Sequence, residues 1–427
     1  MRLFELKKHH TTVRQEVIAG FTTFLAMLYI VPVNAAIMSL SGMPYDALIT
    51  ATAVITLIAS VLNGLWANTP IAMSVGMGLN AYFTFGLVQG MKIPWQSALG
   101  IVFVSGILYF IVSITPLRRW MIDTIPLDIK KAVSAAIGAF IAFIGLKEAG
   151  IIVDSKATLV TLGDMKSPSV MLALLGIVLG VWFYSKRIKA AFILSILITA
   201  AVAWLFGLSK IPQSFISLPA SMLPIAFKMD ISSALTLSLF PVVITFFVTD
   251  LFDTLGTLVG VGLRADIFKE KRSKELQKTI EADAAATVMS SFAGVSSTTS
   301  FIESAAGVEE GGRTGLSAVV TGLLFLLPLF FLPLFKSIHP NAIYPVLVIV
   351  GALMFSELKN INYKDPAIKF STFFMVLMMP LTYSITNGLM FGAFMYIIIR
   401  LIEGEFREIK TAMGMLALIG ILIFYIL

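Results

Sequence analysis

The chain has 427 residues, of which 58% are hydrophobic and only 13% are charged. Soluble domains carry about 25% charged residues, so the composition excludes an ordinary soluble enzyme or binding module and indicates an integral membrane protein. The net charge of +7 comes from Lys and Arg beside apolar runs, which is typical of loops that flank membrane spans and not of a nucleic-acid-binding face. The chain has no cysteine, which excludes disulfides and thiolate chemistry.

Apolar runs predict fourteen membrane spans, because about 20 apolar residues cross a bilayer as a helix. In chain order, seven are expected at 16–38, 46–66, 71–89, 97–116, 126–147, 169–186 and 188–207. Seven more are expected at 234–259, 281–293, 301–312, 314–335, 341–357, 366–384 and 386–402. Basic residues concentrate in alternate loops, so we expect a multi-pass protein of the cytoplasmic membrane with its N-terminus in the cytoplasm. Whether the apolar tail 411–427 also spans is left open.

The two sets of seven predict an inverted repeat. Because seven is odd, the second set enters the membrane in the opposite sense to the first. The third and tenth spans hold corresponding places, and both are interrupted by small residues, at 72–80 and at 294–300. Paired interruptions of this kind indicate the substrate site of a transporter. We therefore expect an all-α polytopic fold with a site between the two breaks.

Two carboxylates, Asp250 and Asp253, lie inside the predicted span 234–259. An ionised acid at the centre of a bilayer helix costs about 2.5–3.5 kcal/mol, so it is expected to face protein or a water-filled cavity and is a candidate functional site. The two acids are three residues apart and share one helix face, with Thr254 close to that face. The alternatives are a helix end in contact with water for the pair, and a structural hydrogen bond for Asp250.

Three further residues lie next to the breaks. Glu303 follows the second break and is expected in the first turn of a half-helix, where the helix dipole favours a carboxylate; simple capping is the alternative. Asn80 follows the first break, where it is expected to cap a half-helix or to offer a donor and an acceptor to a ligand. Phe301 is the best candidate to stack on a flat ligand. Glu281 and Asp283 are expected at the inner membrane face.

All three histidines lie outside the predicted spans. If transport is coupled to protons, a carboxylate must therefore carry the proton within the membrane. The candidates are Asp250, Asp253 and Glu303, because burial changes the protonation of a carboxyl group.

At these segments the chain resembles the nucleobase–cation symporters of the xanthine/uracil permease superfamily, and within it the AzgA-like purine permeases. The matching pieces are Thr22–Tyr29 (TTFLAMLY), Gly76–Phe83 (GMGLNAYF), Asp250–Thr257 (DLFDTLGT), Ser297–Ser304 (STTSFIES) and Met379–Ser384 (MPLTYS). The resemblance implies a core domain of spans 1–4 and 8–11, within residues 1–125 and 234–338. It implies a gate domain of spans 5–7 and 12–14, within residues 126–233 and 339–427.

The resemblance also implies roles for single residues. Asp253 and Glu303 would accept hydrogen bonds from purine N–H groups, and Asn80 would assist from the third span. Thr257 stands where the uracil transporters of the superfamily have a histidine, so their scheme of proton coupling cannot be carried over directly. Phe301 stands where a tyrosine is frequent in the family.

The function expected from the sequence is secondary-active, proton-coupled uptake of purine nucleobases. No cofactor and no nucleic acid are expected to take part, and the chain has no Gly-x-x-x-x-Gly-Lys-Ser/Thr motif for ATP. The preferred purine and the choice of H⁺ or Na⁺ are left open, and the family fold is compatible with a homodimer. Two alternatives remain: an anion transporter of the same architecture, and an intramembrane aspartyl hydrolase that uses Asp253 and Glu303.

Overall fold

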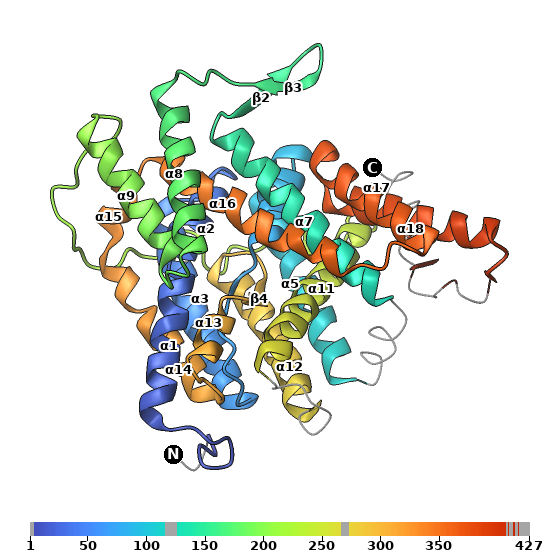
Figure 1. Ribbon diagram of the computed structural model, residues 1–427, viewed down its shortest axis with the longest axis horizontal. Helices are drawn as coiled ribbons and strands as arrows, with labels where there is room; N and C mark the ends of the chain where they lie inside the picture. Colours follow the sequence, from blue (N-terminus) through green and yellow to red (C-terminus); the bar gives the residue numbers. More distant parts are fainter. Residues whose placement is uncertain are drawn as a thin grey trace.

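A computed structural model describes residues 4–115, 126–265 and 273–406, together with residues 409, 413, 414 and 417. Figure 1 shows a bundle of helices, with the N-terminus at one end and the β2–β3 hairpin at the opposite end. The apolar tail 411–427 lies almost wholly outside the described residues, as do parts of two of the predicted basic loops.

Helices make up most of the described chain. Those of the first half are α1 Val13–Met27, α2 Ile30–Ser39, α3 Tyr45–Trp66, α4 Met77–Ala81, α5 Trp95–Ile114, α7 Leu127–Glu148, α8 Pro168–Ser185 and α9 Ala191–Leu205. Those of the second half are α10 Ile231–Ala234, α11 Phe240–Ala265, α12 Ser273–Ala293, α13 Ser304–Glu309, α14 Gly315–Leu324, α15 Leu332–Ser337, α16 Pro340–Phe355, α17 Pro366–Thr382 and α18 Ile385–Ile402. A π-helical segment, Tyr82–Gly90, continues α4, and 3₁₀ segments lie at Leu327–Phe330 and Ser356–Asn360.

Four short strands depart from the expected all-α architecture, which is wrong in this detail. β1 (Met73–Val75) pairs antiparallel with β4 (Thr298–Ser300). β2 (Ile152–Ser155) pairs antiparallel with β3 (Leu159–Leu162) in a hairpin. At the two breaks, small residues leave the helical conformation, and buried backbone groups must then find other partners. The two extended segments meet this requirement by pairing with each other.

Seven described helical segments are long and apolar enough to cross a membrane, by length and composition. They are Val13–Ser39, Tyr45–Trp66, Trp95–Ile114, Leu127–Glu148, Pro168–Ser185, Pro340–Asn360 and Ile385–Ile402. Shorter apolar helices lie at Ala191–Leu205, Gly315–Phe330 and Pro366–Thr382. The chain is therefore a mostly helical, multi-pass membrane protein.

The expected span 16–38 lies within the apolar helical segment Val13–Ser39, in which two turn residues separate α1 from α2. Two other expected boundaries are wrong. The helix expected at 234–259 lies six residues later, as α11 Phe240–Ala265. The helix expected at 281–293 already begins at Ser273. Its first turns carry charged residues, which a helix tolerates where it extends beyond the apolar part of the structure. Because these turns are not apolar, hydropathy detected only the second half of the helix.

The helices of the two halves pack in corresponding ways. In the first half, α5 contacts α11 and α12; in the second, α14 contacts α1 and α3. The pairs α3–α12 and α7–α16 each join one half to the other, and α8 packs on α16 as α17 packs on α7. Exchanging each helix for its counterpart seven predicted spans away leaves this pattern unchanged.

Glycines allow close crossings between these helices. A Cβ added to Gly138 on α7 would lie 2.6 Å from the carbonyl oxygen of Gly351 on α16, and a Cβ on Gly351 would lie 2.4 Å from that of Gly138. Both distances are too short for a side chain. Small residues at helix interfaces are typical of membrane bundles, because they let backbones approach closely.

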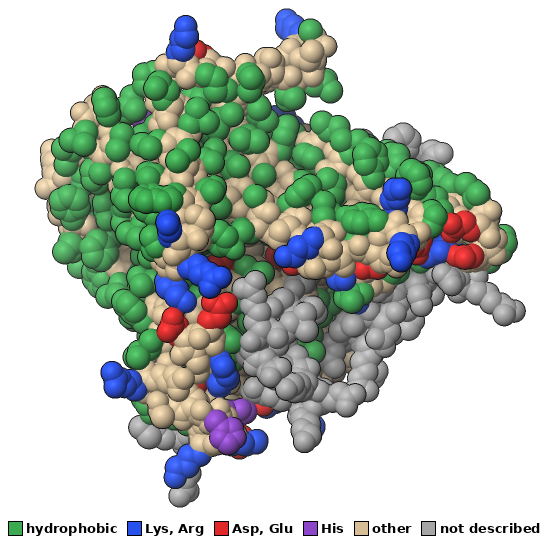
Figure 2. All heavy atoms as spheres, viewed as in Figure 1, with side chains coloured by type: hydrophobic (Ala, Val, Ile, Leu, Met, Phe, Trp, Pro, Cys, Tyr) green, Lys and Arg blue, Asp and Glu red, His purple; other side chains and the backbone are tan. Residues whose placement is uncertain are grey.

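The surface has the character of a protein embedded in lipid. Figure 2 shows a broad hydrophobic area over α8, α9 and their neighbours, while charged side chains gather toward the end that carries the N-terminus and along the end of α18. The hydrophobic area includes exposed Val178, Val181 and Trp182 of α8. Broad exposed apolar areas mark interaction surfaces, and in a multi-pass membrane protein such an area faces the lipid.

Candidate functional site

The crossing of β1 and β4 brings the two sequence breaks together. Met73 lies opposite Ser300 and Val75 lies opposite Thr298. The pairing continues at both ends, where the N–H of Gly76 donates to the carbonyl of Ser297 at 2.9 Å and the N–H of Phe301 donates to that of Ala72 at 3.0 Å. Because the strands are antiparallel, α4 and α13 leave this crossing in opposite directions. The sequence identified both breaks, but it did not predict that they pair as strands.

Asp253 of α11 reaches the crossing. A Cβ added to Gly76 would lie 3.7 Å from Oδ2 of Asp253 and 3.3 Å from Cγ2 of Thr299, so the carboxylate stands beside the junction between β1 and α4. The Thr299 hydroxyl contacts the same carboxylate, and Glu303 lies within electrostatic range of it. The Asp253 side chain is only partly buried, which leaves it accessible to a ligand.

Glu303 lies one residue before α13, so it is not inside the first turn of the helix. Its side chain makes no capping hydrogen bond among the described residues, so the capping interpretation is wrong. Instead, the Tyr29 hydroxyl donates a 2.6 Å hydrogen bond to Oε1 of Glu303. Tyr29 lies in the interruption between α1 and α2 and is 1% exposed, whereas Glu303 is partly buried.

Sequence reasoning missed Tyr29 as a partner of the site. It belongs to the segment Thr22–Tyr29 that carries the family resemblance, but nothing in its local sequence indicates that its hydroxyl binds a residue of the site. The signal that could have found it is the interruption of the first span, since hydroxyl side chains at a helix break are free to reach across a bundle.

Asn80 lies inside α4 and is fully buried. The residue that precedes the helix is Gly76, so the expectation that Asn80 caps it is wrong. Its Nδ2 donates to Oδ1 of Asn34 at 2.5 Å, and Nδ2 of Asn34 donates to the hydroxyl of Thr52 at 2.7 Å. Oδ1 of Asn80 has no hydrogen-bond partner among the described residues, which leaves one acceptor available.

Phe301 follows β4 directly, and its side chain is 7% exposed. Its N–H donates to the carbonyl of Ala72, so its backbone lies at the end of the strand crossing. Stacking on a ligand stays a prediction.

A second acidic cluster lies behind the crossing. Oδ2 of Asp250 accepts a hydrogen bond from the hydroxyl of Thr287 at 2.9 Å, and the same hydroxyl lies 3.0 Å from the carbonyl of Thr298. Asp250 is 2% exposed, so the interpretation of this acid as a water-contacting helix end is wrong. Oδ1 of Asp250 has no hydrogen-bond partner within the described part of the chain.

Asp283 of α12 is the second acid of this cluster, and its expected place at the inner membrane face is wrong. It is fully buried and accepts hydrogen bonds from the hydroxyls of Thr254 and, at 3.3 Å, Tyr109. The error follows from the boundary of α12: once the helix begins at Ser273, Asp283 lies near its middle. The hydroxyl of Thr254 also lies 3.1 Å from the hydroxyl of Thr299 on β4.

Asp250 and Asp253 thus share a face of α11 but lie in different environments. Asp253 and Glu303 remain partly accessible at the crossing. Asp250 and Asp283 are buried behind it and reach β4 through threonine hydroxyls. The site therefore has an accessible pair of acids, joined through Thr254 and Thr299 to a buried pair.

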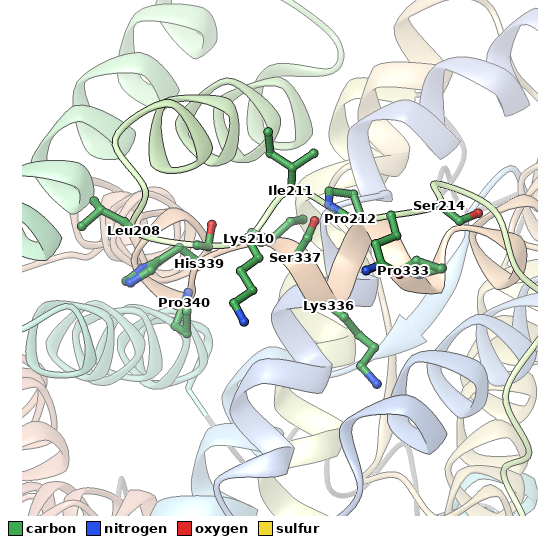
Figure 3. A pocket seen from close by; sticks show the side chains of 13 residues that line it. Leu208, Lys210, Ile211, Pro212, Ser214, Pro333, Lys336, Ser337, His339 and Pro340 are labelled. Atoms are coloured by element: carbon green, nitrogen blue, oxygen red, sulfur yellow. The ribbon is translucent and has the colours of Figure 1, made fainter.

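A hollow of about 630 Å³ lies elsewhere, between segment 208–214 and the segment 333–340 that includes α15. Figure 3 shows Lys210, Lys336 and His339 among the side chains that line it. Its described lining contains no acid and none of the residues at the crossing. We therefore propose the crossing, where polar groups from both halves of the chain converge, as the candidate site in preference to this hollow.

Comparison with known proteins places the chain in a family. Residues 14–425 match the model of xanthine/uracil permeases, described as the Permease family. The chain belongs to this permease family. Members of the permease family are transporters, so the interpretation as an intramembrane hydrolase is wrong.

Two relatives from the permease family match over almost their whole length. The chain is 39% identical over 422 residues to the adenine permease AdeP of Escherichia coli (strain K12), covering 99% of this chain and 95% of the relative. It is 38% identical over 434 residues to the guanine/hypoxanthine permease PbuO of Bacillus subtilis (strain 168), covering 100% of both.

The fold of this permease also occurs in a solved structure. The transmembrane domain of a cyanobacterium bicarbonate transporter, BicA, superposes with a TM-score of 0.66 at 16% identity, covering 86% of this chain and 96% of that chain. At this identity the likeness shows the fold alone and carries no information on the solute.

Proposed function

We propose that this permease takes up purine nucleobases by secondary active transport. The observation that carries the proposal is the convergence of Asp253 and Glu303 at the crossing of β1 and β4, where both acids remain partly accessible. The named activities of the relatives, adenine permease and guanine/hypoxanthine permease, point to the same class of solute.

The chemistry of a purine fits this pair of acids. A purine is flat, neutral and rich in N–H donors, and carboxylates are strong acceptors. A hydrogen bond to a charged group contributes about 1.5–3 kcal/mol, and micromolar binding needs about 8 kcal/mol in all. Two such bonds contribute about 3–6 kcal/mol, and stacking on Phe301 and a contact to the free Oδ1 of Asn80 add to it.

We assign Thr254 an indirect part in binding. Its hydroxyl is fully buried and is shared between Asp283 and Thr299. In this position it holds Thr299, whose own hydroxyl contacts Asp253. We propose that Thr254 sets the orientation of the substrate-binding acid from behind β4.

We propose that a proton drives uptake, because a neutral nucleobase gains nothing from the membrane potential by itself. One proton that enters down 100 mV supplies about 2.3 kcal/mol. Asp250 is the favoured carrier, since burial of an unpaired charge is costly and its described hydrogen-bond partner is a hydroxyl; Asp253 and Glu303 are the other candidates. Coupling to Na⁺ is the alternative that the transport assay decides.

The proposed architecture has fourteen spans in a 7+7 inverted repeat. Two observations support it: the corresponding packing of helices from the two halves, and the antiparallel pairing of β1 with β4 at the interrupted third and tenth spans. In this scheme residues 1–125 and 234–338 form the core domain, and residues 126–233 and 339–427 form the gate domain. The N-terminus lies in the cytoplasm, and a homodimer would form through the gate domain.

Uptake by cells that lack their own purine permeases tests the function. Cells that express the chain are given radiolabelled adenine, hypoxanthine, guanine or uracil, with and without a protonophore, and in Na⁺ or K⁺ buffer. We expect saturable purine uptake that collapses with the protonophore and is insensitive to Na⁺. If correctly inserted protein imports no nucleobase above background, the proposal is wrong.

A further inference from the structure

The hydroxyl of Tyr29 is not the only part of this side chain that makes a specific contact. Its ring meets the ring of Phe192 edge to face, with centroids 5.1 Å apart and an interplanar angle of 78°. Phe192 is the second residue of α9 and is 7% exposed. Tyr29 therefore touches the acid at the crossing with its hydroxyl and touches α9 with its ring.

The two partners of Tyr29 belong to different proposed domains. Glu303 and Tyr29 lie in the core domain, whereas Phe192 lies in the gate domain. An uncharged, fully buried side chain that spans two bodies in this way can transmit a local change from one to the other, because close-packed interiors do not deform continuously.

Glu303 and Tyr29 lie next to two closely packed helices, α13 and α1. α13 packs on α1 so closely that a Cβ on Gly307 would lie 2.2 Å from the hydroxyl of Thr23 and 2.5 Å from the carbonyl of Ala19. The glycine therefore lets the two helices pack in close contact. We expect a change in the position of the Glu303 carboxylate to be taken up by the Tyr29 side chain that is bonded to it.

A second contact joins the same two regions. Nζ of Lys189, three residues before Phe192, lies 3.1 Å from Oε1 of Glu310, which follows α13. Both side chains are more than a third exposed, so this ion pair contributes little energy. It does show that the start of α9 and the end of α13 lie side by side, and it offers a place to report on their separation.

We propose that Tyr29 is a positioning residue with two roles. Its hydroxyl orients Glu303 for the nucleobase, and its ring is displaced against Phe192 of α9 when a nucleobase binds Glu303. A ligand N–H that binds Glu303 displaces the carboxylate slightly, and the Tyr29 hydroxyl that is bonded to the same carboxylate moves with it. The ring then shifts against Phe192 and favours movement of the gate domain. This inference rests on the proposed function.

Two single variants separate the two roles. Tyr29→Phe removes the hydroxyl and keeps the ring; Phe192→Leu removes the aromatic edge and leaves the hydroxyl bond. We expect Tyr29→Phe to weaken binding of adenine or hypoxanthine by the purified protein about tenfold, because a Glu303 carboxylate without its Tyr29 hydrogen bond is no longer held in the orientation that the ligand N–H needs. We expect Phe192→Leu to leave binding unchanged and to lower the maximal rate of uptake at least about fivefold, with the rate restored by Phe192→Tyr.

Matched controls remove trivial explanations. Tyr45→Phe deletes another tyrosine hydroxyl, which donates to the carbonyl of Phe335 at 3.3 Å. Phe24→Leu disrupts another edge-to-face pair, with Phe325 at 5.3 Å, within the proposed core domain. Both are expected to bind and transport like the wild type. If Tyr29→Phe binds like Tyr45→Phe, or if Phe192→Leu transports like Phe24→Leu, the proposal is overturned.

The absence of cysteine from the chain allows a readout that does not depend on transport. In the double variant Lys189→Cys/Glu310→Cys, a bifunctional thiol reagent reports the separation of α9 and α13. We expect adenine or hypoxanthine to change the rate of cross-linking, and Phe192→Leu, but not Phe24→Leu, to abolish this change. A nucleobase effect that survives Phe192→Leu, or no effect at all, overturns the proposal.

The two proposals fail in different ways. If the wild-type chain neither binds nor imports a nucleobase, the proposed function is wrong and the inference falls with it. If the wild type transports purines while the variants behave like their controls, only the role of Tyr29 is wrong.

Discussion

The hydroxyl of Thr287 donates to Oδ2 of Asp250 at 2.9 Å and lies 3.0 Å from the backbone carbonyl of Thr298. This single side chain ties a fully buried acid of α11 to the strand that crosses β1. Thr254 makes the same kind of link from Asp283 to Thr299, the next residue of β4. A change in the charge of either buried acid therefore alters the hydrogen bonding of the strand at the candidate substrate site.

The accessible acids are expected to account for substrate affinity. Asp253→Asn and Glu303→Gln keep the size of each side chain but replace a charged acceptor with a neutral amide. Loss of one charge-assisted hydrogen bond costs about 1.5–3 kcal/mol, so we expect the half-saturation constant for purine uptake to rise at least about tenfold in each variant. Uptake kinetics and binding by purified protein measure this.

The control for these variants is Asp46→Asn. Asp46 is an exposed acid whose carboxylate pairs with Lys336 at 2.9 Å, away from the crossing. It should transport like the wild type. Wild-type kinetics in folded Asp253→Asn and Glu303→Gln would remove both residues from the site.

Asp250→Asn tests proton coupling. An amide at this position keeps an acceptor for Thr287 but cannot take up and release a proton. We expect proteoliposomes with this variant to exchange purines across the membrane and to lose accumulation driven by a pH gradient. Accumulation that still responds fully to the gradient would show that Asp250 is not the proton carrier.

Asp230 supplies a matched acid outside the spans. Hydrogen bonds from Ser232 and Ser233 lower the pKa of the Asp230 carboxyl to about 2. A carboxyl group with a lowered pKa stabilises the folded state at any pH above its pKa in the unfolded chain, about 3.9. This stabilisation is lost as the pH falls through the folded pKa of about 2. Between pH 5 and 8 Asp230 does not titrate, so Asp230→Asn should leave the pH profile of uptake unchanged.

Glu16 is expected to be structural. This fully buried carboxylate accepts hydrogen bonds from the N–H groups of Arg313 and Thr314, at 2.8 and 3.3 Å, and from the hydroxyl of Ser317. It thereby satisfies backbone donors at the start of α14, which lack partners inside the helix. Glu16→Ala leaves these donors unpaired.

An unpaired buried donor costs about 1–3 kcal/mol, so we expect Glu16→Ala to lower the thermal unfolding midpoint in detergent without changing the affinity for purines. An unchanged midpoint would contradict the structural role, and a selective loss of affinity would point to a role in binding instead.

The crossing of α7 and α16 depends on glycine. Gly138→Val would place side-chain carbons where the carbonyl of Gly351 lies 2.6 Å from the Cβ position. Overpacking typically costs about 1–3 kcal/mol, so we expect a lower unfolding midpoint in detergent. Ala139→Val, at the neighbouring and less buried position, is the control and should be close to the wild type. Equal midpoints for the two variants would show that the helices separate at no cost.

Local composition was enough to predict much of this protein. Long apolar runs can be stable in a bilayer only as spans, because unsatisfied backbone groups are excluded there; α3, α5, α7, α8, α16 and α18 lie within two residues of their expected ends. Runs of small residues revealed the breaks before Asn80 and Glu303. An acid in an apolar run is conspicuous, which made Asp250, Asp253 and Glu303 candidates.

Tertiary structure decided everything that depends on partners distant in the sequence. The pairing of β1 with β4 joins residues more than two hundred positions apart, and no local pattern fixes such a register. The start of α12 at Ser273 moved Asp283 from the membrane face to the interior, because hydropathy does not register charged turns of a continuous helix. The bond between Tyr29 and Glu303 arose in the same way: a tyrosine at a helix break is an ordinary apolar residue until packing brings a carboxylate to its hydroxyl. The sequence determined which residues are costly to bury in a membrane, and the fold alone determined which groups offset that cost.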